Sequence, residues 1–216
     1  MAYKKYHMVF VCVNRLTNSR HREHGSDSDT NKVNIKERNY IQETLRSVFN
    51  DAGFSYWVDK LMDVSVFDSG STDLSYLDFI KKEFPFIKIH KSKERITLCE
   101  NSNRAFKYGA ERAEHVIYIQ DDVKVTENLG YILDKRYNTV PTDFSFCSLF
   151  WNRGSGEAWQ KVPRKSFYGS LFMMAKSSTV EEMLGWFEQT KQRLQGSGHD
   201  LGIRDYADKY NKPIYQ

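Results

Sequence analysis

Two adjacent acidic residues, Asp121 and Asp122, follow the apolar run VIYI and Gln120. Neighbouring carboxylates at the end of a buried strand repel each other, and a bound cation would offset that repulsion. Oxygen ligands of this kind suit Mg²⁺ or Mn²⁺, and such an ion can bridge a diphosphate and stabilise it as a leaving group. The alternative is a strand end that turns into solvent with two exposed acids.

A second polar cluster, DSGSTD at residues 68–73, follows the apolar run VSVF. Gly70 permits a tight turn, and Ser71 or Asp73 can cap the helix expected next. At the strand end, Asp68 could accept hydrogen bonds from a nucleotide base or a ribose. The alternative is a strand-to-helix turn with no ligand.

A third pair, Asn101 and Arg104, lies one turn apart at the start of an expected helix. Both side chains would face a ligand over the sheet edge, and the guanidinium of Arg104 suits phosphate or ribose oxygens. The alternative for this pair is a solvated helix face.

An alternation of strands and helices would position these three clusters. Apolar runs predict strands at 9–13, 64–67, 87–90, 116–119, 144–150 and 170–174. Helical spacing predicts helices at 36–50, 74–84, 100–114, 128–138, 177–194 and 200–210, and residues 17–34 read as a long exposed loop. The alternation predicts an α/β fold with a mostly parallel, doubly wound sheet and helices on both faces. Ligands of such sheets bind at the carboxyl ends of the strands, where residues 14–15, 68–73 and 120–122 are expected.

Length and composition exclude several classes of protein. The chain has 216 residues, of which 40% are hydrophobic, 14% aromatic and 28% charged, so one folded domain over 1–216 is expected rather than disorder or a coiled coil. No apolar run approaches the roughly 20 residues needed to cross a bilayer, and the first residues predict a strand rather than a signal peptide. Three widely spaced cysteines, Cys12, Cys99 and Cys147, indicate reduced thiols and a cytoplasmic protein. The net charge of +4 favours anionic ligands only weakly.

Together the three clusters resemble the nucleotide-sugar half of the GT-A glycosyltransferases, over roughly residues 8–125. The resemblance implies a Rossmann-like GT-A domain that uses Mn²⁺ or Mg²⁺ and a nucleotide-sugar donor, with UDP the expected nucleotide. Asn14 or Arg15 and Asp68 would hold the nucleoside. Asp121 and Asp122 would stand for the family's Asp-x-Asp motif, with Asp121 nearer the ribose and Asp122 the better metal ligand; here Gln120 replaces the first carboxylate.

Residues 126–216 would then form the acceptor-binding half. Tryptophans at 151 and 159 could wall an acceptor pocket or pack in the core, and residues 168–172 resemble the glycine-containing strand that passes the donor sugar. In inverting members of the family, an acid near Asp200 removes the proton from the acceptor hydroxyl, so Asp200 is the candidate base, or else a helix cap. His199 could act as a base, bind metal or have no role.

Basic residues gather in three places, at 15–24, 91–95 and 161–165. They could be solvated surface, or they could follow the phosphates of a nucleic-acid acceptor. The compact, Lys-, Asn- and Tyr-rich chain is also similar to the small bacteriophage glycosyltransferases that modify hydroxymethylated cytosine in DNA, which would act in the host cytoplasm. Two other functions remain open: a nucleotidyltransferase, and a non-catalytic nucleic-acid-binding module.

Overall fold

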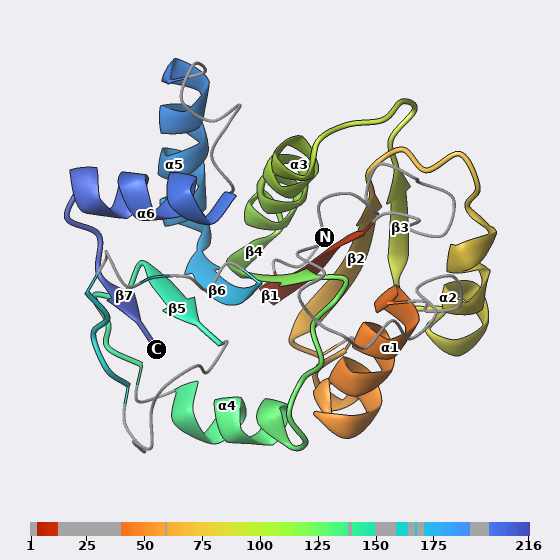
Figure 1. Ribbon diagram of the computed structural model, residues 1–216. Helices are drawn as coiled ribbons and strands as arrows, with labels where there is room; N and C mark the ends of the chain where they lie inside the picture. Colours follow the sequence, from red (N-terminus) through yellow and green to blue (C-terminus); the bar gives the residue numbers. More distant parts are fainter. Residues whose placement is uncertain are drawn as a thin grey trace, which may run out of the picture.

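Seven strands form one sheet, in the order β3-β2-β1-β4-β6-β5-β7 (Figure 1). The computed structural model describes residues 4–12, 40–58, 60–137, 140–149, 159–163, 167, 171–190 and 199–216, and only the backbone of 136, 137, 199 and 200. The strands are β1 (Lys4–Cys12), β2 (Met62–Asp68), β3 (Lys88–Lys91), β4 (Ala113–Gln120), β5 (Phe146–Ser148), β6 (Phe172–Lys176) and β7 (Ile214–Tyr215). β1 to β4 are mutually parallel where they pair, which confirms the predicted parallel half.

β6 reverses the direction of the sheet. It pairs antiparallel with both β4 and β5, whereas β5 and β7 are parallel. The backbone N–H of Gln120 donates to the carbonyl of Leu171 at 2.9 Å, so the start of β6 lies beside the end of β4. At the far edge, Gln160 and Val162 form backbone hydrogen bonds with residues 214 and 216.

Helices cover both faces of the sheet, as the sequence predicts. They are α1 (Tyr40–Arg46), α2 (Asp78–Glu83), α3 (Leu98–Ala110), α4 (Leu129–Tyr137), α5 (Ser177–Gln189) and α6 (His199–Lys209). Shorter turns of helix are η3 (Ser47–Asp51), η4 (Phe54–Trp57) and η5 (Ser75–Leu77). Successive residues of β1 alternate between two cores because side chains of a strand point to opposite faces. Met8 and Phe10 pack with α1 and η3, whereas Val9 and Val11 pack with α3.

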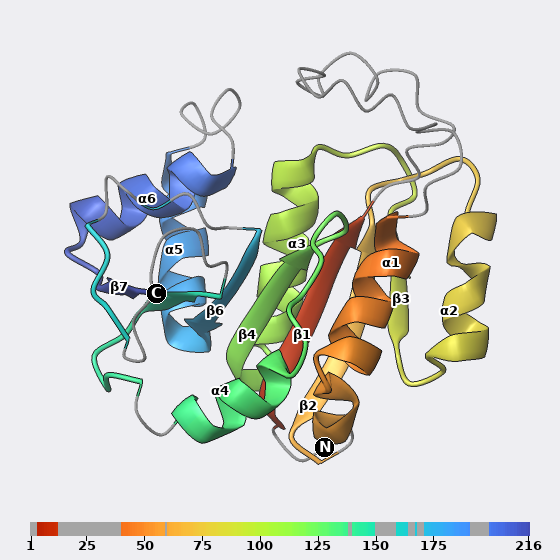
Figure 2. The same cartoon turned by 60° about the horizontal axis from the view of Figure 1, so that its bottom comes forward.

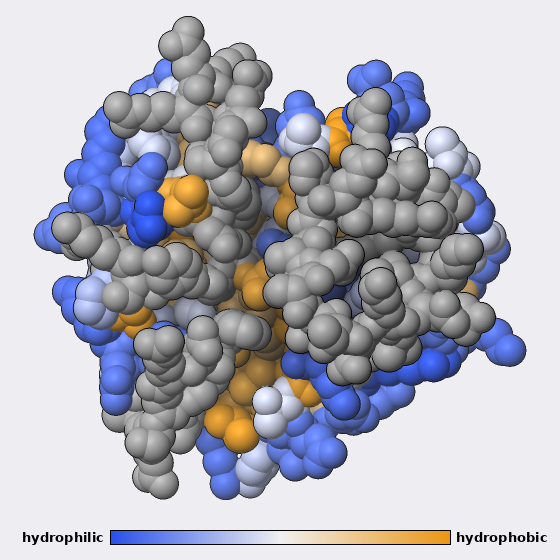
Figure 3. Space-filling model, in the orientation of Figure 1, coloured by the Kyte–Doolittle hydropathy of each residue, from blue (hydrophilic) through white to orange (hydrophobic). Residues whose placement is uncertain are grey.

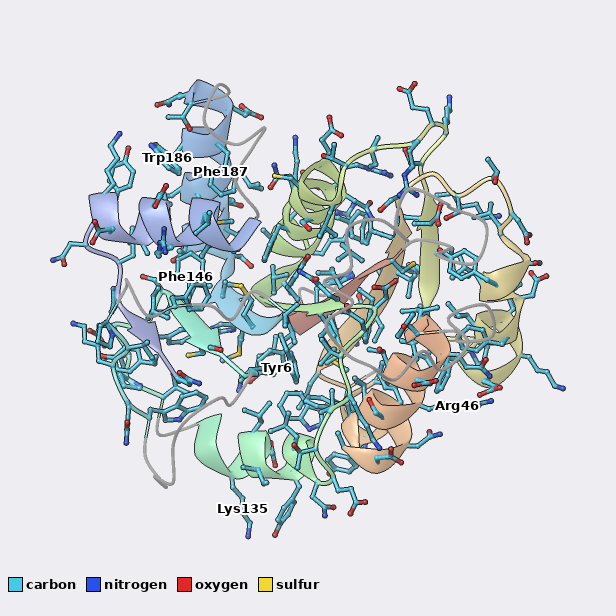
Figure 4. The ribbon with its side chains drawn as sticks, viewed as in Figure 1. Tyr6, Arg46, Lys135, Phe146, Trp186 and Phe187 are labelled. Atoms are coloured by element: carbon cyan, nitrogen blue, oxygen red, sulfur yellow. The ribbon has the colours of Figure 1, made fainter. Side chains whose placement is uncertain are left out.

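The second core lies under α5 and α6. Figure 4 shows Trp186 and Phe187 of α5 and Phe146 of β5 in this part of the molecule, and Tyr206 of α6 contacts the rings of both Phe146 and Trp186. In the view of Figure 3, hydrophilic residues form much of the rim and hydrophobic residues lie toward the middle. Within the described ranges, no helix combines the length and the apolar character needed to span a bilayer.

Several predicted boundaries differ from the observed ones. The helix expected to run to Glu114 ends at Ala110, and β4 already begins at Ala113. The terminal residues, for which no strand was expected, form β7. The strand expected at 170–174 lies at Phe172–Lys176, and the one expected at 144–150 has only three residues. The predicted loop 17–34 and the start of the helix predicted from 36 lie outside the described residues.

Candidate functional site

The carboxyl ends of β2, β1 and β4 meet at one edge of the sheet, as predicted. Cys12 at the end of β1 pairs with Asp68, and Val11 pairs with Gln120, so all three strands end at nearly the same level. Asp68 and Asp121 therefore lie on either side of β1. Two interstrand spacings of about 4.8 Å separate their strands by roughly 10 Å.

Asp68 is fully buried, and its carboxylate organises the turn that follows β2. Oδ2 accepts hydrogen bonds from the backbone N–H groups of Gly70 (2.9 Å) and Ser71 (2.8 Å). Oδ1 accepts from the hydroxyls of Ser71 and Tyr76, each at 2.6 Å. A carboxylate offers about four lone-pair positions, so this one is saturated by its own turn. Asp68 thus holds the turn after β2 in its observed shape.

Tyr76 was not singled out from the sequence, because a tyrosine eight residues after an acid belongs to no motif. Its hydroxyl lies between Asp68 and the Cys12 thiol, 3.3 Å from Sγ. Burial is the main cause that raises the pKa of Tyr76, with Cys12 and Asp68 adding to it, so this hydroxyl stays protonated as a donor. Farther along the turn, Asp73 accepts from the N–H of Ser75 at 2.8 Å. The N-cap residues are Leu74 for η5 and Leu77 for α2, neither with a side-chain cap, so the prediction that Ser71 or Asp73 caps the helix is wrong.

Gly70 allows the turn after β2 to touch the loop after β3. Its φ is +84°, and a Cβ at this position would lie 2.0 Å from the carbonyl oxygen of Glu94. Two backbone hydrogen bonds join the same loops: Ser92 N–H donates to the Asp68 carbonyl at 3.2 Å, and Ile96 N–H donates to that of Ser69 at 3.0 Å. The turn after β2 and the loop after β3 are therefore held together by backbone contacts at this edge of the sheet.

Asn101 joins helix α3 to this edge. A capping box at Thr97 and Glu100 begins the helix, and Asn101 follows within its first turn. The side-chain amide of Asn101 donates to the Phe67 carbonyl (2.8 Å) and to the Ser69 hydroxyl (2.9 Å). Its Oδ1 is buried without a hydrogen-bond partner among the described residues. Asn101 thus links the start of α3 to the end of β2, and its Oδ1 remains available as an acceptor within the described part of the chain.

Arg104 of α3 lies near enough to His90 of β3 for its charge to act on that imidazole. The residue is partly exposed, and its Nη1 is buried without a hydrogen-bond partner in the described part of the chain. Burial lowers the pKa of His90 in β3, and the positive charge of Arg104 is the next cause. A guanidinium with an unused donor beside a neutral imidazole is suited to an anionic ligand.

The acidic pair divides into a buried and an exposed residue. Asp121 is 4% exposed and Asp122 is exposed. The Thr44 hydroxyl donates to the backbone carbonyl of Asp121 at 2.7 Å. Within the described ranges, no group of three or more His, Cys, Asp or Glu side chains could enclose a metal ion. Two carboxylates at a strand end still fit Mg²⁺ or Mn²⁺, which commonly use one or two carboxylates together with phosphate oxygens of the substrate.

Other predicted site residues are less fully placed. His199 and Asp200 begin α6, which packs against α5 and α3 and lies beside the upper part of α5 in Figure 2. Asn14 and Arg15 lie outside the described residues, as do Trp151 and residues 168–170. Of the basic residues at 91–95 and 161–165, Lys91, Lys93, Arg95 and Lys161 are described, and each is exposed.

The fold resembles that of solved glycosyltransferases. A mannosyltransferase from Pyrobaculum calidifontis, in complex with GDP-Man and Mn²⁺, is 14% identical with a TM-score of 0.58, and the match covers 99% of this chain and 54% of that one. GalNAc-T7 with UDP, GalNAc and Mn²⁺ is 11% identical with a TM-score of 0.61, and the match covers 99% and 42%. The chain thus spans about half the length of these two proteins.

A third solved structure belongs to a different kind of enzyme. The 4-diphosphocytidyl-2C-methyl-D-erythritol synthase from Anaerococcus prevotii is 8% identical with a TM-score of 0.57, and the match covers 97% of this chain and 83% of that one. No family model matches the sequence, and no curated protein matches it. These similarities establish the α/β fold shared with GT-A glycosyltransferases, as predicted.

Proposed function

We propose that this protein is a metal-dependent GT-A glycosyltransferase that transfers a sugar from a nucleotide-sugar donor, with UDP the expected nucleotide, to an acceptor hydroxyl. The observation that carries the proposal is the edge where the Asp68 turn, the start of α3 and the Asp121–Asp122 pair meet. The presence of GDP-Man or UDP with Mn²⁺ in two structures of similar fold supports it.

The donor would lie across the ends of β2, β1 and β4. In this proposal Asn14 or Arg15 and the turn built by Asp68 hold the nucleoside, and Asn101 supports that turn from behind. Arg104 supplies a positive charge for ribose or phosphate oxygens. Residues 8–125 are the donor half and residues 126–216 the acceptor half.

Asp122, assisted by Asp121, would hold Mn²⁺ or Mg²⁺ at the diphosphate. When bound, such an ion neutralises the charge that develops on the departing nucleoside diphosphate. Asp200 is proposed as the base, with His199 the other candidate. The acceptor oxygen forms the new bond to the anomeric carbon, its proton passes to Asp200, and the bond from that carbon to the diphosphate oxygen breaks.

The acceptor is proposed to be either a glycan hydroxyl or the hydroxymethyl group of a modified base in bacteriophage DNA, the latter placing the enzyme in the host cytoplasm. The exposed basic residues Lys91, Lys93 and Arg95 support a phosphate-bearing acceptor. A base acceptor would have to be flipped out of the duplex or be single-stranded.

The decisive experiment measures hydrolysis or transfer with a panel of nucleotide sugars, with and without Mn²⁺. Changing Asp122→Ala should reduce turnover by more than about 100-fold while Tm stays near that of the unchanged protein. Asp134→Ala, which removes an exposed carboxylate from α4, is the matched control and should keep full turnover. Normal turnover of Asp122→Ala would remove the metal assignment.

Nucleotidyl transfer is the second candidate, because strand-end acids and a metal ion would serve it too, and the fold is similar to that of a 4-diphosphocytidyl-2C-methyl-D-erythritol synthase as well as to glycosyltransferases. Release of pyrophosphate from a nucleoside triphosphate, without turnover of any nucleotide sugar, would favour it. Salt-dependent binding of DNA with neither reaction would instead favour a non-catalytic nucleic-acid-binding module.

A further inference from the structure

The segment that begins with the acidic pair runs beside helix α1 and its continuation η3. Residues 121–130, here called the 121–130 segment, run beside residues 44–52 with hydrogen bonds at four levels. Asn128 N–H donates to the Asp51 carbonyl at 3.0 Å, and Gly130 N–H donates to the Ala52 carbonyl at 2.8 Å. These two bonds fix the far end of the segment.

Two buried hydroxyls fix the near end. Thr44 and Ser47 are each 2% exposed. The Thr44 hydroxyl donates to the Asp121 carbonyl at 2.7 Å, and the Ser47 hydroxyl accepts from Val125 N–H at 3.1 Å. Ser47 also donates to the Thr44 carbonyl at 2.9 Å, so the two hydroxyls form one connected unit.

The bond from Thr44 acts on the peptide group that joins Asp121 to Asp122. A peptide group is planar, so a fixed carbonyl direction sets the plane and restricts the two rotations on either side of it. One of these rotations is the φ of Asp122, which determines where the exposed Asp122 side chain points. The hydroxyl of Thr44 therefore controls the direction of a carboxylate that it does not touch.

We propose that Thr44 is a positioning residue for the metal-binding acid, an inference that rests on the proposed function. The hydroxyl orients the Asp121–Asp122 peptide so that Asp122 is held ready for the cation before the cation binds. Groups that orient metal ligands commonly contribute 10- to 100-fold to affinity, and preorganisation of the ligand is the physical reason. Ser47 extends the same support to Val125.

The test compares three variants by titrating Mn²⁺ and measuring binding of UDP. Thr44→Val keeps the shape of the side chain but removes the donor, and it should raise the Mn²⁺ concentration for half-maximal UDP binding by about 10-fold. Its binding of UDP without Mn²⁺ should not change. Thr44→Ser keeps the hydroxyl and should restore the Mn²⁺ dependence of the unchanged protein.

Ser177→Ala is the matched control for a general loss of stability. The buried Ser177 hydroxyl donates to the Ala113 carbonyl at 2.5 Å, which is the same kind of bond at the opposite end of β4. We expect Tm to fall in both Ser177→Ala and Thr44→Val, but the Mn²⁺ dependence to change only in Thr44→Val.

The outcomes separate this inference from the function on which it rests. If the unchanged protein binds UDP in a Mn²⁺-dependent way and Thr44→Val shows the same Mn²⁺ dependence as Ser177→Ala, the positioning role is wrong and the proposed function stands. If the unchanged protein shows no Mn²⁺-dependent binding of any nucleotide or nucleotide sugar, the proposed function is wrong, and the inference falls with it.

Discussion

At the scale of single residues, the acids of the sheet edge have distinct tasks. Both carboxylate oxygens of Asp68 accept hydrogen bonds from its own turn, whereas Asp122 is exposed beside the buried Asp121. Burying a charge is tolerated only when hydrogen bonds replace water, and Asp68 meets that condition with four donors. A sequence cannot display this difference, because all three positions are simply Asp after an apolar run.

Gly70 should tolerate no side chain. Gly70→Ala would place a methyl group 2.0 Å from the Glu94 carbonyl at a φ of +84°. We expect the free energy of unfolding to fall by at least about 2 kcal/mol, since strain and a backbone clash add together. Urea denaturation measures the change. Gly185→Ala is the control, because a Cβ there meets no atom within 4 Å, and equal stability of the two variants would contradict the expectation.

The proposed base is tested by Asp200→Asn. An amide cannot accept the proton of the acceptor hydroxyl, so kcat should fall by about 100-fold or more while the affinity for the donor is kept. Steady-state kinetics together with binding of UDP separates the two quantities. A normal kcat would leave Asp200 with a structural role in the first turn of α6.

At the scale of elements, helix α3 is the part that brings the β2 turn and the β3 side together. The Asn101 side chain in its first turn bonds to Phe67 and Ser69, and in its last turn Tyr108 contacts His90 of β3 with ring centroids 4.3 Å apart. The helix is begun by the capping box, in which the Thr97 hydroxyl accepts from Glu100 N–H at 3.1 Å.

Thr97→Ala should lower the free energy of unfolding by about 1 kcal/mol, the usual contribution of an N-cap. Thr97→Ser should restore it, since the serine hydroxyl can make the same bond. Thermal unfolding of the three proteins provides the measurement. Nucleotide binding should stay close to normal in both variants, because Asn101 is held by two bonds of its own.

Much of the element pattern could be predicted, because each strand of the parallel half is a continuous apolar run. The capping box explains why α3 begins at Leu98, two residues before the position expected from its apolar spacing. The predicted end of α3 was wrong because Ala113 is small and apolar, so it suits either a helix or the start of β4. β7 was missed because two paired residues are too short to show an alternation. The hydrogen bonds of Thr44 and Ser47 could not be predicted, since their partners lie some 77 residues away in the sequence.

At the scale of the whole molecule, three histidines make the fold sensitive to acid. Burial is the main cause that lowers the pKa of His7, His90 and His115. His7 is completely buried in β1, with Nε2 2.9 Å from the Ser65 hydroxyl and its ring against Tyr108. Each of these side chains is therefore neutral in the native state at neutral pH.

Stability should fall as the pH is lowered from about 6.5 to about 4. The pKa of His7 is lowered from 6.5 to about 4, so the unfolded chain binds its proton first and acid favours unfolding. The contribution of His7 to the free energy of unfolding is present in full above pH 6.5 and amounts to at most about 3 kcal/mol. Urea denaturation across this range should give a smaller slope for His7→Gln than for the unchanged protein. Equal slopes would show that His7 does not contribute.

The antiparallel direction of β6 places its two ends at opposite borders of the sheet. Leu171 meets Gln120 just before the acidic pair, whereas Lys176, at the other end of β6, leads directly into α5 at the opposite border of the sheet. Residues added just ahead of Leu171 would lie beside the edge proposed to bind the donor, whereas residues added beyond Lys176 would lie at the opposite border of the sheet. Under the proposed function, an insertion at the first junction should therefore weaken binding of a nucleotide sugar more than an insertion of the same length at the second.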